Sequence, residues 1–268
     1  MKFGSITTGI IADGLVFNMD AANRASYPAQ RTFAIAESGS CYNTLDLSQS
    51  GSFISDPTFI TQPISASCWG FDGIDDYIRA TRAEGTIAWN AAVLATYNIW
   101  VKINDTSPAN IPIFCGDGNR GLGRDSNQFM VLNDKLAWIL DSSTSPSSKC
   151  YIATEDIDGS GAAPNLLDGN WHNLVIYNPV TGDSTRADIA NAKIYLDTIK
   201  LTNTTINEGS NSIRGGSDGV ICLGLGNAGG NTSQLYLIGN IGCIQYYNRE
   251  LSANEVLHNY NALKGRFI

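Results

Sequence analysis

Three aspartates crowd one short turn in the first third of the chain. In CWGFDGIDDYIRA, Cys68–Ala80, the residues Asp72, Asp75 and Asp76 lie between aromatic and aliphatic side chains that are typical of two strands. Hard divalent cations prefer clustered carboxylate oxygens, so these side chains are candidate Ca²⁺ ligands. Asp also favours tight turns, because its carboxylate accepts hydrogen bonds from its own backbone. A plain corner between two strands is the competing interpretation, and no cofactor is required for folding.

The other acidic residues and the histidines have spacings that do not favour catalysis. Glycosidases need paired carboxylates, and neighbours on one strand face are two residues apart. In TEDIDG, Asp156 and Asp158 have that spacing, but Glu155 stands alone on the opposite face. His172 and His258 have no Ser or Cys nucleophile placed beside them by a motif. The sequence therefore predicts a protein that is not an enzyme.

The charge of the chain narrows the class of partner. The 268 residues include 17 basic and 25 acidic side chains, for a net charge of -8, and a surface of that sign repels phosphate groups. We therefore expect no nucleic-acid partner and no membrane partner, and no segment reaches the roughly 20 apolar residues of a membrane span. The opening MKFGSITTGIIADG lacks the apolar run and cleavage site of a secretory signal, which predicts folding in a cytoplasm.

The six cysteines are scattered and contain no C-x-x-C pair, which argues against a zinc site or thioredoxin-like redox chemistry. We expect most of them to be reduced, small, buried hydrophobic residues. Because their number is even, disulfides stay an open alternative. The cysteines are Cys41, Cys68, Cys115, Cys150, Cys222 and Cys243.

Alternating apolar residues predict β-strands over most of the chain. In YNIWVKI, Tyr97–Ile103, the odd-numbered residues share one face and the even-numbered ones the other, which is the period of a half-buried strand. NWHNLVIYN, Asn170–Asn178, is apolar on both faces and is typical of a central strand. Two polar pairs, Asn133–Asp134 and Asp197–Thr198, interrupt apolar runs and predict hairpin turns. This pattern fits a single β-sandwich.

One helix is predicted at the end of the chain, over residues 252–264. Ser252 and Glu255 have the spacing of a capping box, and Gly265 marks the expected end. A stripe of apolar residues should pack the helix on the sandwich. The stripe consists of Val256, Tyr260 and Leu263.

The first residues of the chain form a separate unit in this interpretation. Residues 1–12 are expected to be an N-terminal arm, and residues 13–268 the sandwich with its helix. Ile6, Ile10 and Ile11 offer apolar anchors for laying the arm on a neighbouring subunit. An ordinary first strand of the sandwich is an equal alternative.

Six segments, taken in order, cover almost the whole chain: ADGLVFNMDAANRASYP, FDGIDDYI, YNIWVKI, WHNLVIY, KIYLDTIKL and YNRELSANEVLHNYNALKGRF. Together they resemble the laminin-G-like (LamG-like), concanavalin-A-like jelly-roll family, in the form found in bacteriophage virions. The resemblance implies an all-β, antiparallel jelly-roll β-sandwich with a short C-terminal α-helix. The family often has Asp-Gly where this chain has Asp197 and Thr198, and a β-branched residue is poorly suited to positive φ.

The resemblance also implies a function. It predicts a non-enzymatic structural protein of the virion, such as a capsid-surface decoration, a fibre or a tail-associated subunit, assembled in the host cytoplasm. Expected partners are other virion proteins and further copies of the chain, since such proteins are typically symmetric oligomers. The alternative is a carbohydrate-binding module that attaches a particle to host surface polysaccharide, with Trp89 as the best candidate for an exposed platform. An extracellular adhesion module is a third class, because one sandwich serves many functions.

Overall fold

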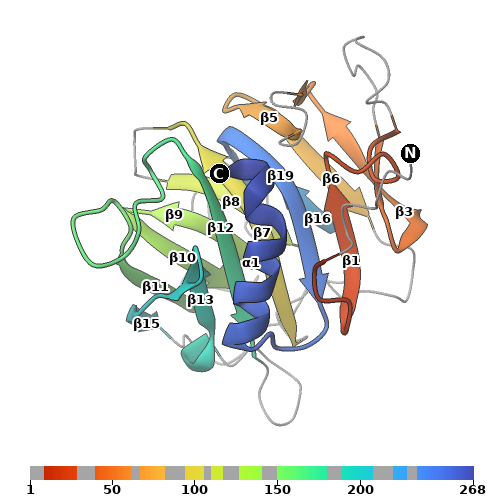
Figure 1. Ribbon diagram of the computed structural model, residues 1–268. Coiled ribbons are helices and arrows are strands. Elements are labelled where there is room, and N and C mark those ends of the chain that lie inside the picture. The colour runs from red at the N-terminus through yellow and green to blue at the C-terminus, as the bar shows by residue number, and fades with distance from the viewer. Residues whose placement is uncertain are drawn as a thin grey trace.

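The computed structural model describes residues 9–28, 40–61, 67–81, 94–105, 110–116, 127–140, 150–179, 189–207, 220–227 and 234–268. Two antiparallel sheets lie face to face, and one helix covers the outer side of the first sheet (Figure 1). The expected all-β jelly-roll sandwich with a C-terminal helix is confirmed. The single α-helix of the described residues is not long and apolar enough to span a bilayer.

The first sheet has the strand order β14-β13-β12-β7-β19-β5-β4, and β1 also pairs with β19. Its strands are β1 (Leu15–Asp20), β4 (Thr58–Ile60), β5 (Cys68–Asp72), β7 (Ala95–Ile103), β12 (Trp171–Asn178), β13 (Lys193–Leu196), β14 (Ile199–Lys200) and β19 (Ile238–Tyr247).

The second sheet has the order β15-β11-β10-β9-β8-β16-β6-β3-β2. Its strands are β2 (Ser40–Asn43), β3 (Asp46–Ile54), β6 (Tyr77–Thr81), β8 (Asn110–Gly116), β9 (Asn127–Leu132), β10 (Lys135–Leu140), β11 (Cys150–Asp156), β15 (Asn203–Asn207) and β16 (Val220–Leu223). A separate hairpin of β17 (Leu225–Asn227) and β18 (Gln234–Tyr236) packs on β8 and β9, and a 3₁₀ turn spans Ile189–Asn191.

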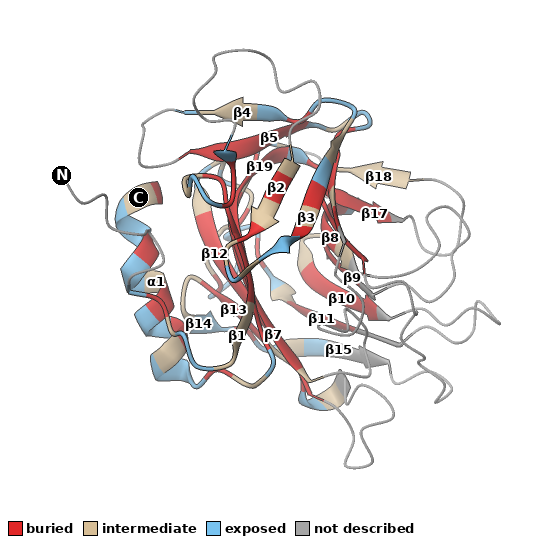
Figure 2. Ribbon diagram, turned by 90° about the vertical axis from the view of Figure 1, so that its right-hand side faces the viewer, coloured by how far each residue is buried: buried red, intermediate tan, exposed pale blue. Residues whose placement is uncertain are grey.

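Strand β7 is buried on both faces, so the expectation of a half-buried strand is wrong. Tyr97 and Ile99 enter the core between the sheets, as the alternation predicts. On the other face, Trp100 stacks on Tyr260 and Phe267 of the terminal helix, with ring centroids 5.4 Å and 4.6 Å away. The helix therefore takes the place that water would occupy on a two-layer sandwich. Figure 2 shows the buried strands between the helix and the second sheet.

Buried amide side chains bridge four neighbouring strands of the first sheet. Asn173 of β12 donates to the Oδ1 of Asn98 in β7 over 2.7 Å, and Asn98 donates to the Oε1 of Gln245 in β19 over 2.8 Å. Gln245 in turn donates to Asn18 of β1 over 3.2 Å. Each of the four is at most 1% exposed. Hydrogen bonds from each amide to the next offset most of the cost of burying them, and the Oδ1 of Asn173 is the oxygen in this row that is buried without a partner.

Helix α1 (Ala253–Phe267) begins where the capping box predicts. The hydroxyl of Ser252 accepts a hydrogen bond from the Glu255 backbone, and the Glu255 carboxylate accepts one from the backbone of Ser252. The expected end at residue 264 and the expected stop at Gly265 are wrong, because the helix continues to Phe267. Gly265 is not among the described residues with positive φ. Burial of the Phe267 ring against Trp100 and Trp171 holds the last turn in place.

Both predicted hairpin turns form, and all four of their residues have positive φ. Asn133 and Asp134 have φ of 48° and 62°, and Asp197 and Thr198 have φ of 47° and 73°. This is the geometry of two-residue turns that match the twist of a hairpin. Thr198 adopts it although its β-branched side chain disfavours positive φ.

Replacing Thr198 with Gly should therefore stabilise the protein by about 1 kcal/mol, because Gly adopts positive φ without steric cost. We expect the melting temperature to rise by about 2–4 °C in a calorimetric scan. The matched control is Thr202→Gly, at an exposed Thr that is not among the residues with positive φ. That change should lower the melting temperature, and equal effects at the two sites would contradict the strain argument.

Candidate functional site

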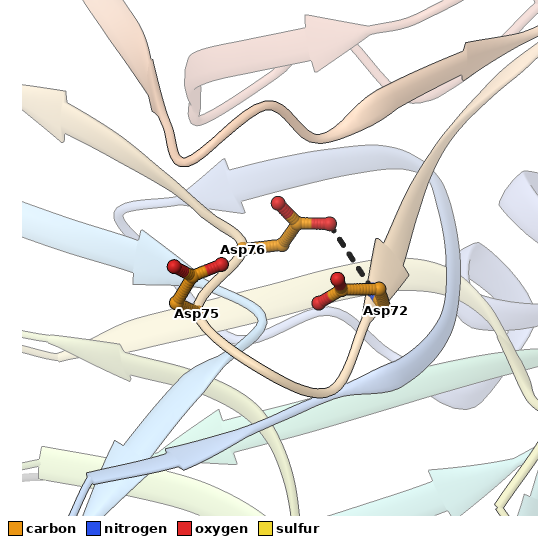
Figure 3. Close-up of side chains that lie close together, drawn as sticks. All are labelled: Asp72, Asp75 and Asp76. Atoms are coloured by element: carbon orange, nitrogen blue, oxygen red, sulfur yellow. Dashed lines mark hydrogen bonds between the residues drawn. The ribbon is translucent and has the colours of Figure 1, made fainter.

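The acidic turn joins β5 to β6 and brings together the three predicted aspartates. Gly73 opens the turn with φ of 81°, and a Cβ atom there would lie 2.2 Å from Cγ1 of Ile238. Only glycine fits that position without a shift. One carboxylate oxygen from each of Asp72, Asp75 and Asp76 lies within 4.8 Å of the other two. Figure 3 shows the three carboxylates gathered on one side of the turn.

The three carboxylates differ in burial. Asp72 and Asp75 are exposed, whereas Asp76 is only 3% exposed. The Oδ2 of Asp76 accepts a hydrogen bond from the Asp72 backbone over 3.1 Å, and its buried Oδ1 has no partner. Burial raises the pKa of Asp76 to about 6, and the negative charges of Asp72, Asp75 and Asp56 act in the same direction. This carboxylate therefore holds a proton more readily than an ordinary Asp side chain.

The same turn also has the bonds of a structural corner. The Oδ1 of Asp72 accepts a hydrogen bond from the Ile74 backbone over 2.8 Å, which is the side-chain bond that favours Asp in tight turns. The corner interpretation and the cation interpretation thus use different oxygens of the same residues. Neither geometry excludes the other.

Apolar and aromatic groups flank the acidic turn. Ile74, in the acidic turn, is 72% exposed, and Ile238, which lies against Gly73 of the same turn, is 39% exposed. Tyr77 and Tyr236 follow, with ring centroids 6.5 Å apart. Burial raises the pKa of Tyr236, and so do the nearby Tyr77 and Asp75. This edge therefore combines carboxylate acceptors with partly exposed apolar surface.

The tryptophans are mostly core residues, as expected. Trp69, Trp100 and Trp138 are at most 1% exposed, and Trp171 packs on Phe267 with centroids 4.8 Å apart. Trp89, the predicted glycan platform, lies outside the described residues. Its role stays a prediction.

A buried histidine lies between two aspartates in a cluster that the sequence did not predict. The Nδ1 of His172 lies 2.6 Å from Asp197, and its Nε2 lies 3.0 Å from Asp168. Asp197 belongs to the β13–β14 turn, and its other oxygen accepts the Asn173 backbone amide over 2.8 Å. The expectation of an ordinary sheet-face residue did not include this pairing. Only the i, i+4 spacing of Asp168 and His172 could have suggested half of it.

This cluster should make stability depend on pH. Burial alone lowers the pKa of His172, but hydrogen bonds to Asp197 and Asp168 outweigh it, so the pKa in the folded protein is raised. A raised folded pKa contributes stability below the unfolded value of about 6.5, and that stability is lost as pH rises through the folded pKa. Tyr260 also lies near this cluster: burial raises its pKa, and so does the charge of Asp197.

The measurement is the melting temperature against pH for the parent and for His172→Gln. The difference between them should be largest below the unfolded value of about 6.5 and should shrink as the pH rises through the raised folded pKa. His258→Gln is the control, because His258 is exposed on α1. A pH profile that is the same in parent and His172→Gln would refute the assignment.

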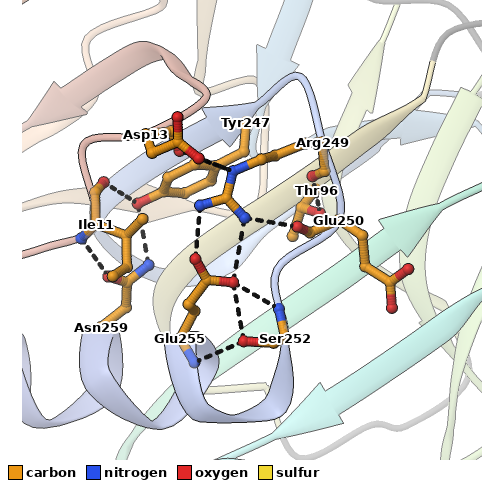
Figure 4. A network of polar contacts seen from close by, with 9 residues as sticks. All are labelled: Ile11, Asp13, Thr96, Tyr247, Arg249, Glu250, Ser252, Glu255 and Asn259. Atoms are coloured by element: carbon orange, nitrogen blue, oxygen red, sulfur yellow. Dashed lines mark hydrogen bonds and ion pairs between the residues drawn. The ribbon is translucent and has the colours of Figure 1, made fainter.

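The end of the predicted arm packs on the chain itself. Ile10 joins a buried cluster with Trp100 and Leu263. The backbone N–H of Ile11 donates to the Oδ1 of Asn259 over 2.8 Å, and its carbonyl accepts the Tyr247 hydroxyl over 3.0 Å (Figure 4). Ile10 and Ile11 thus pack against α1 and β19 of the same chain and are not free to anchor a neighbouring subunit. Ile6 lies outside the described residues, and its contact with a neighbouring subunit stays a prediction.

An arginine beside the arm completes the helix cap. Arg249 pairs with Asp13 over 2.8 Å and with Glu255 over 2.6 Å. Hydrogen bonds from Arg249 and Ser252 lower the pKa of Glu255 to about 2. The cap is therefore ionised throughout the ordinary pH range. It ties the chain before β1 to the first turn of α1.

The remaining acidic and cysteine candidates have structural surroundings. Asp156 pairs with Lys135 over 2.7 Å, and Asp158 accepts the Ser160 backbone amide over 2.9 Å in a turn. Burial raises the thiol pKa of Cys41 and Cys243 to about 12. Such thiols are poor nucleophiles and metal ligands. Four described cysteines are at most 3% exposed, which confirms the expected burial for Cys41, Cys68, Cys222 and Cys243.

No family model matches this sequence, and no curated protein does either. Solved structures do match. One is a structure of botulinum neurotoxin type C, whose cell entry is described as dependent upon interaction with two ganglioside molecules. It has a TM-score of 0.60 at 12% identity, over 93% of this chain and 51% of that chain.

Two further structures belong to the binding domain of botulinum neurotoxin DC. The complex with rat synaptotagmin II has a TM-score of 0.59 at 14% identity, over 94% of this chain and 52% of that chain. The complex with SialylT has a TM-score of 0.58 at 14% identity, over the same shares. The chain thus spans about half the length of these solved chains. At such identity the likeness shows a shared jelly-roll sandwich.

Proposed function

We propose that this protein is a non-enzymatic carbohydrate-binding module. The observation that carries the proposal is the similarity of nearly the whole chain to sandwich domains described with gangliosides and SialylT. Because only about half of each of those chains aligns and the identity is low, their ligands support glycan binding in general and indicate neither the kind of glycan nor its position. The acidic and aromatic edge at the β5–β6 turn is the place in the described residues that best suits a sugar.

The charge of this edge favours neutral sugars over acidic ones. Asp72 and Asp75 are exposed carboxylates in a chain of net charge -8, so a sialylated or uronic-acid glycan would be repelled. Neutral sugar hydroxyls can donate hydrogen bonds to carboxylates. Tyr236 and Ile238 supply apolar contact for the sugar ring. Trp89 would add a stacking surface if it is exposed.

The test is a glycan array of neutral and acidic polysaccharides, followed by titration of each positive glycan. Tyr236→Ala should weaken binding at least tenfold if the β5–β6 edge holds the sugar, and Trp89→Ala tests the other platform. Leu257→Ala, on the exposed side of α1, is the control and should bind like the parent. An array without positive glycans would count against a carbohydrate-binding function.

The virion assignment is a second proposal that rests on sequence resemblance. Its two most specific segments, around β1 and α1, form one packed unit through Arg249 and Asp13. A particle protein with a sugar-binding surface would combine both proposals. Detection of the chain in purified phage particles by mass spectrometry would support this assignment. Its absence from such particles would oppose the assignment.

A further inference from the structure

Asp76 differs from the other buried carboxylate of the described residues. Asp20 is 2% exposed and is paired with Arg266, whose two terminal nitrogens lie 2.8 Å from its oxygens. Asp76 is 3% exposed and has one oxygen with no partner at all. A buried charge without a partner is costly, so proteins usually neutralise it.

No side-chain cation compensates the acidic turn within the described residues. None of Asp72, Asp75 and Asp76 forms an ion pair with Lys or Arg there. The hydrogen bonds that they accept from Ile74 and Asp72 come from neutral backbone amides. Three adjacent negative charges thus face one another, and a bound positive ion would relieve their repulsion.

We propose that Asp72, Asp75 and Asp76 bind one Ca²⁺ ion at the β5–β6 turn. Two ligands of one ion can be separated by at most twice the metal–oxygen distance, which is about 5 Å for Ca²⁺ and about 4 Å for Mg²⁺. The three oxygens lie within 4.8 Å of one another, so each pair has a spacing that two ligands of one Ca²⁺ ion can have, and a small closure of the turn would bring all three onto the ion. Water completes the coordination on the exposed side of Asp72 and Asp75.

The affinity should be modest, because two of the three ligands are exposed. Extracellular Ca²⁺ modules bind with dissociation constants of about 10⁻⁴–10⁻³ M. At 10 mM Ca²⁺ the melting temperature of a chain of this size should rise by about 3–6 °C.

The experiment uses the full chain, freed of metal with EDTA and dialysed. Calorimetric titration with CaCl₂ at pH 7.5 should show one saturable site, and MgCl₂ should bind at least tenfold more weakly. Asp75→Asn should weaken Ca²⁺ binding at least tenfold. Asp158→Asn is the matched control, because it removes the same charge from another exposed turn, and it should bind like the parent.

The variant Asp76→Asn tests whether Asp76 is a cation ligand or only a structural residue of the corner. The amide oxygen can still accept the Asp72 backbone bond, so this variant should melt no lower than the parent in EDTA, yet lose the Ca²⁺ response. No saturable heat together with a melting shift below 1 °C would overturn the proposal, as would an equal response in Asp75→Asn and the parent. The result is independent of the glycan array, so failure of the carbohydrate-binding function would leave it standing.

Discussion

Replacing Trp100 with Ala is expected to lower the free energy of unfolding by about 3–5 kcal/mol, the usual range for a large buried aromatic residue. Trp100 is fully buried on the central strand β7. It stacks on Tyr260 and Phe267, so its loss would leave a cavity under α1. Urea unfolding monitored by circular dichroism measures the change.

Two further variants make the interpretation specific. The indole N–H of Trp100 is buried without a partner, so Trp100→Phe should cost only about 1 kcal/mol, because the stacking stays and an unsatisfied donor is removed. Phe267→Ala should be non-additive with Trp100→Ala by about 1 kcal/mol, since the two rings share one contact. Strict additivity would show that the helix does not dock through this stack.

Replacing Arg266 with Met is also expected to lower the free energy of unfolding by about 3–5 kcal/mol, because it leaves the Asp20 carboxylate buried without its partner. The two side chains are 11% and 3% exposed, and two hydrogen bonds of 2.8 Å join them. The pair connects the last turn of α1 to the end of β1. Thermal and urea unfolding should both show the loss.

The double variant Arg266→Met with Asp20→Asn should recover at least about 1 kcal/mol relative to Arg266→Met alone, since the buried group is then neutral. After the Asp20→Asn change, the side-chain amide oxygen can still accept the Ala22 backbone bond that Asp20 accepts over 2.9 Å. Lys135→Met is the control, because its pair with Asp156 is 30% and 50% exposed on the two side chains, and it should cost at most about 1 kcal/mol. A similar loss at both pairs would contradict the role of burial.

Local sequence patterns determined the elements of this protein. Period-2 alternation in Tyr97–Ile103 predicts the strand, because successive side chains point to opposite faces whatever the surroundings. The pairs Asn133–Asp134 and Asp197–Thr198 predict both turns, and the capping box at Ser252 predicts the helix start. Each of these signals depends on a few neighbouring residues. The resemblance of the six segments then predicted the way the elements pack.

Only the tertiary structure decided what the second face of each strand contacts. The alternation cannot tell that Asn98 is buried in a row of amides or that Trp100 lies under a helix, because Gln245 and Phe267 lie 147 or more residues away along the chain. The helix end also depended on such a contact, since docking of Phe267 overrides the stop signal at Gly265.

The candidate sites divide in the same way. The sequence brought Asp72, Asp75 and Asp76 into one turn, because they are close along the chain. Only the folded structure shows that Asp76 is buried and that its Oδ1 has no partner. The contact of His172 in β12 with Asp197 in the β13–β14 turn joins residues that are 25 positions apart, because β12 pairs with β13 in the sheet. Residues close along the chain determine which side chains share a turn or a cap. Burial and charge pairing depend on contacts between segments that are distant in the sequence.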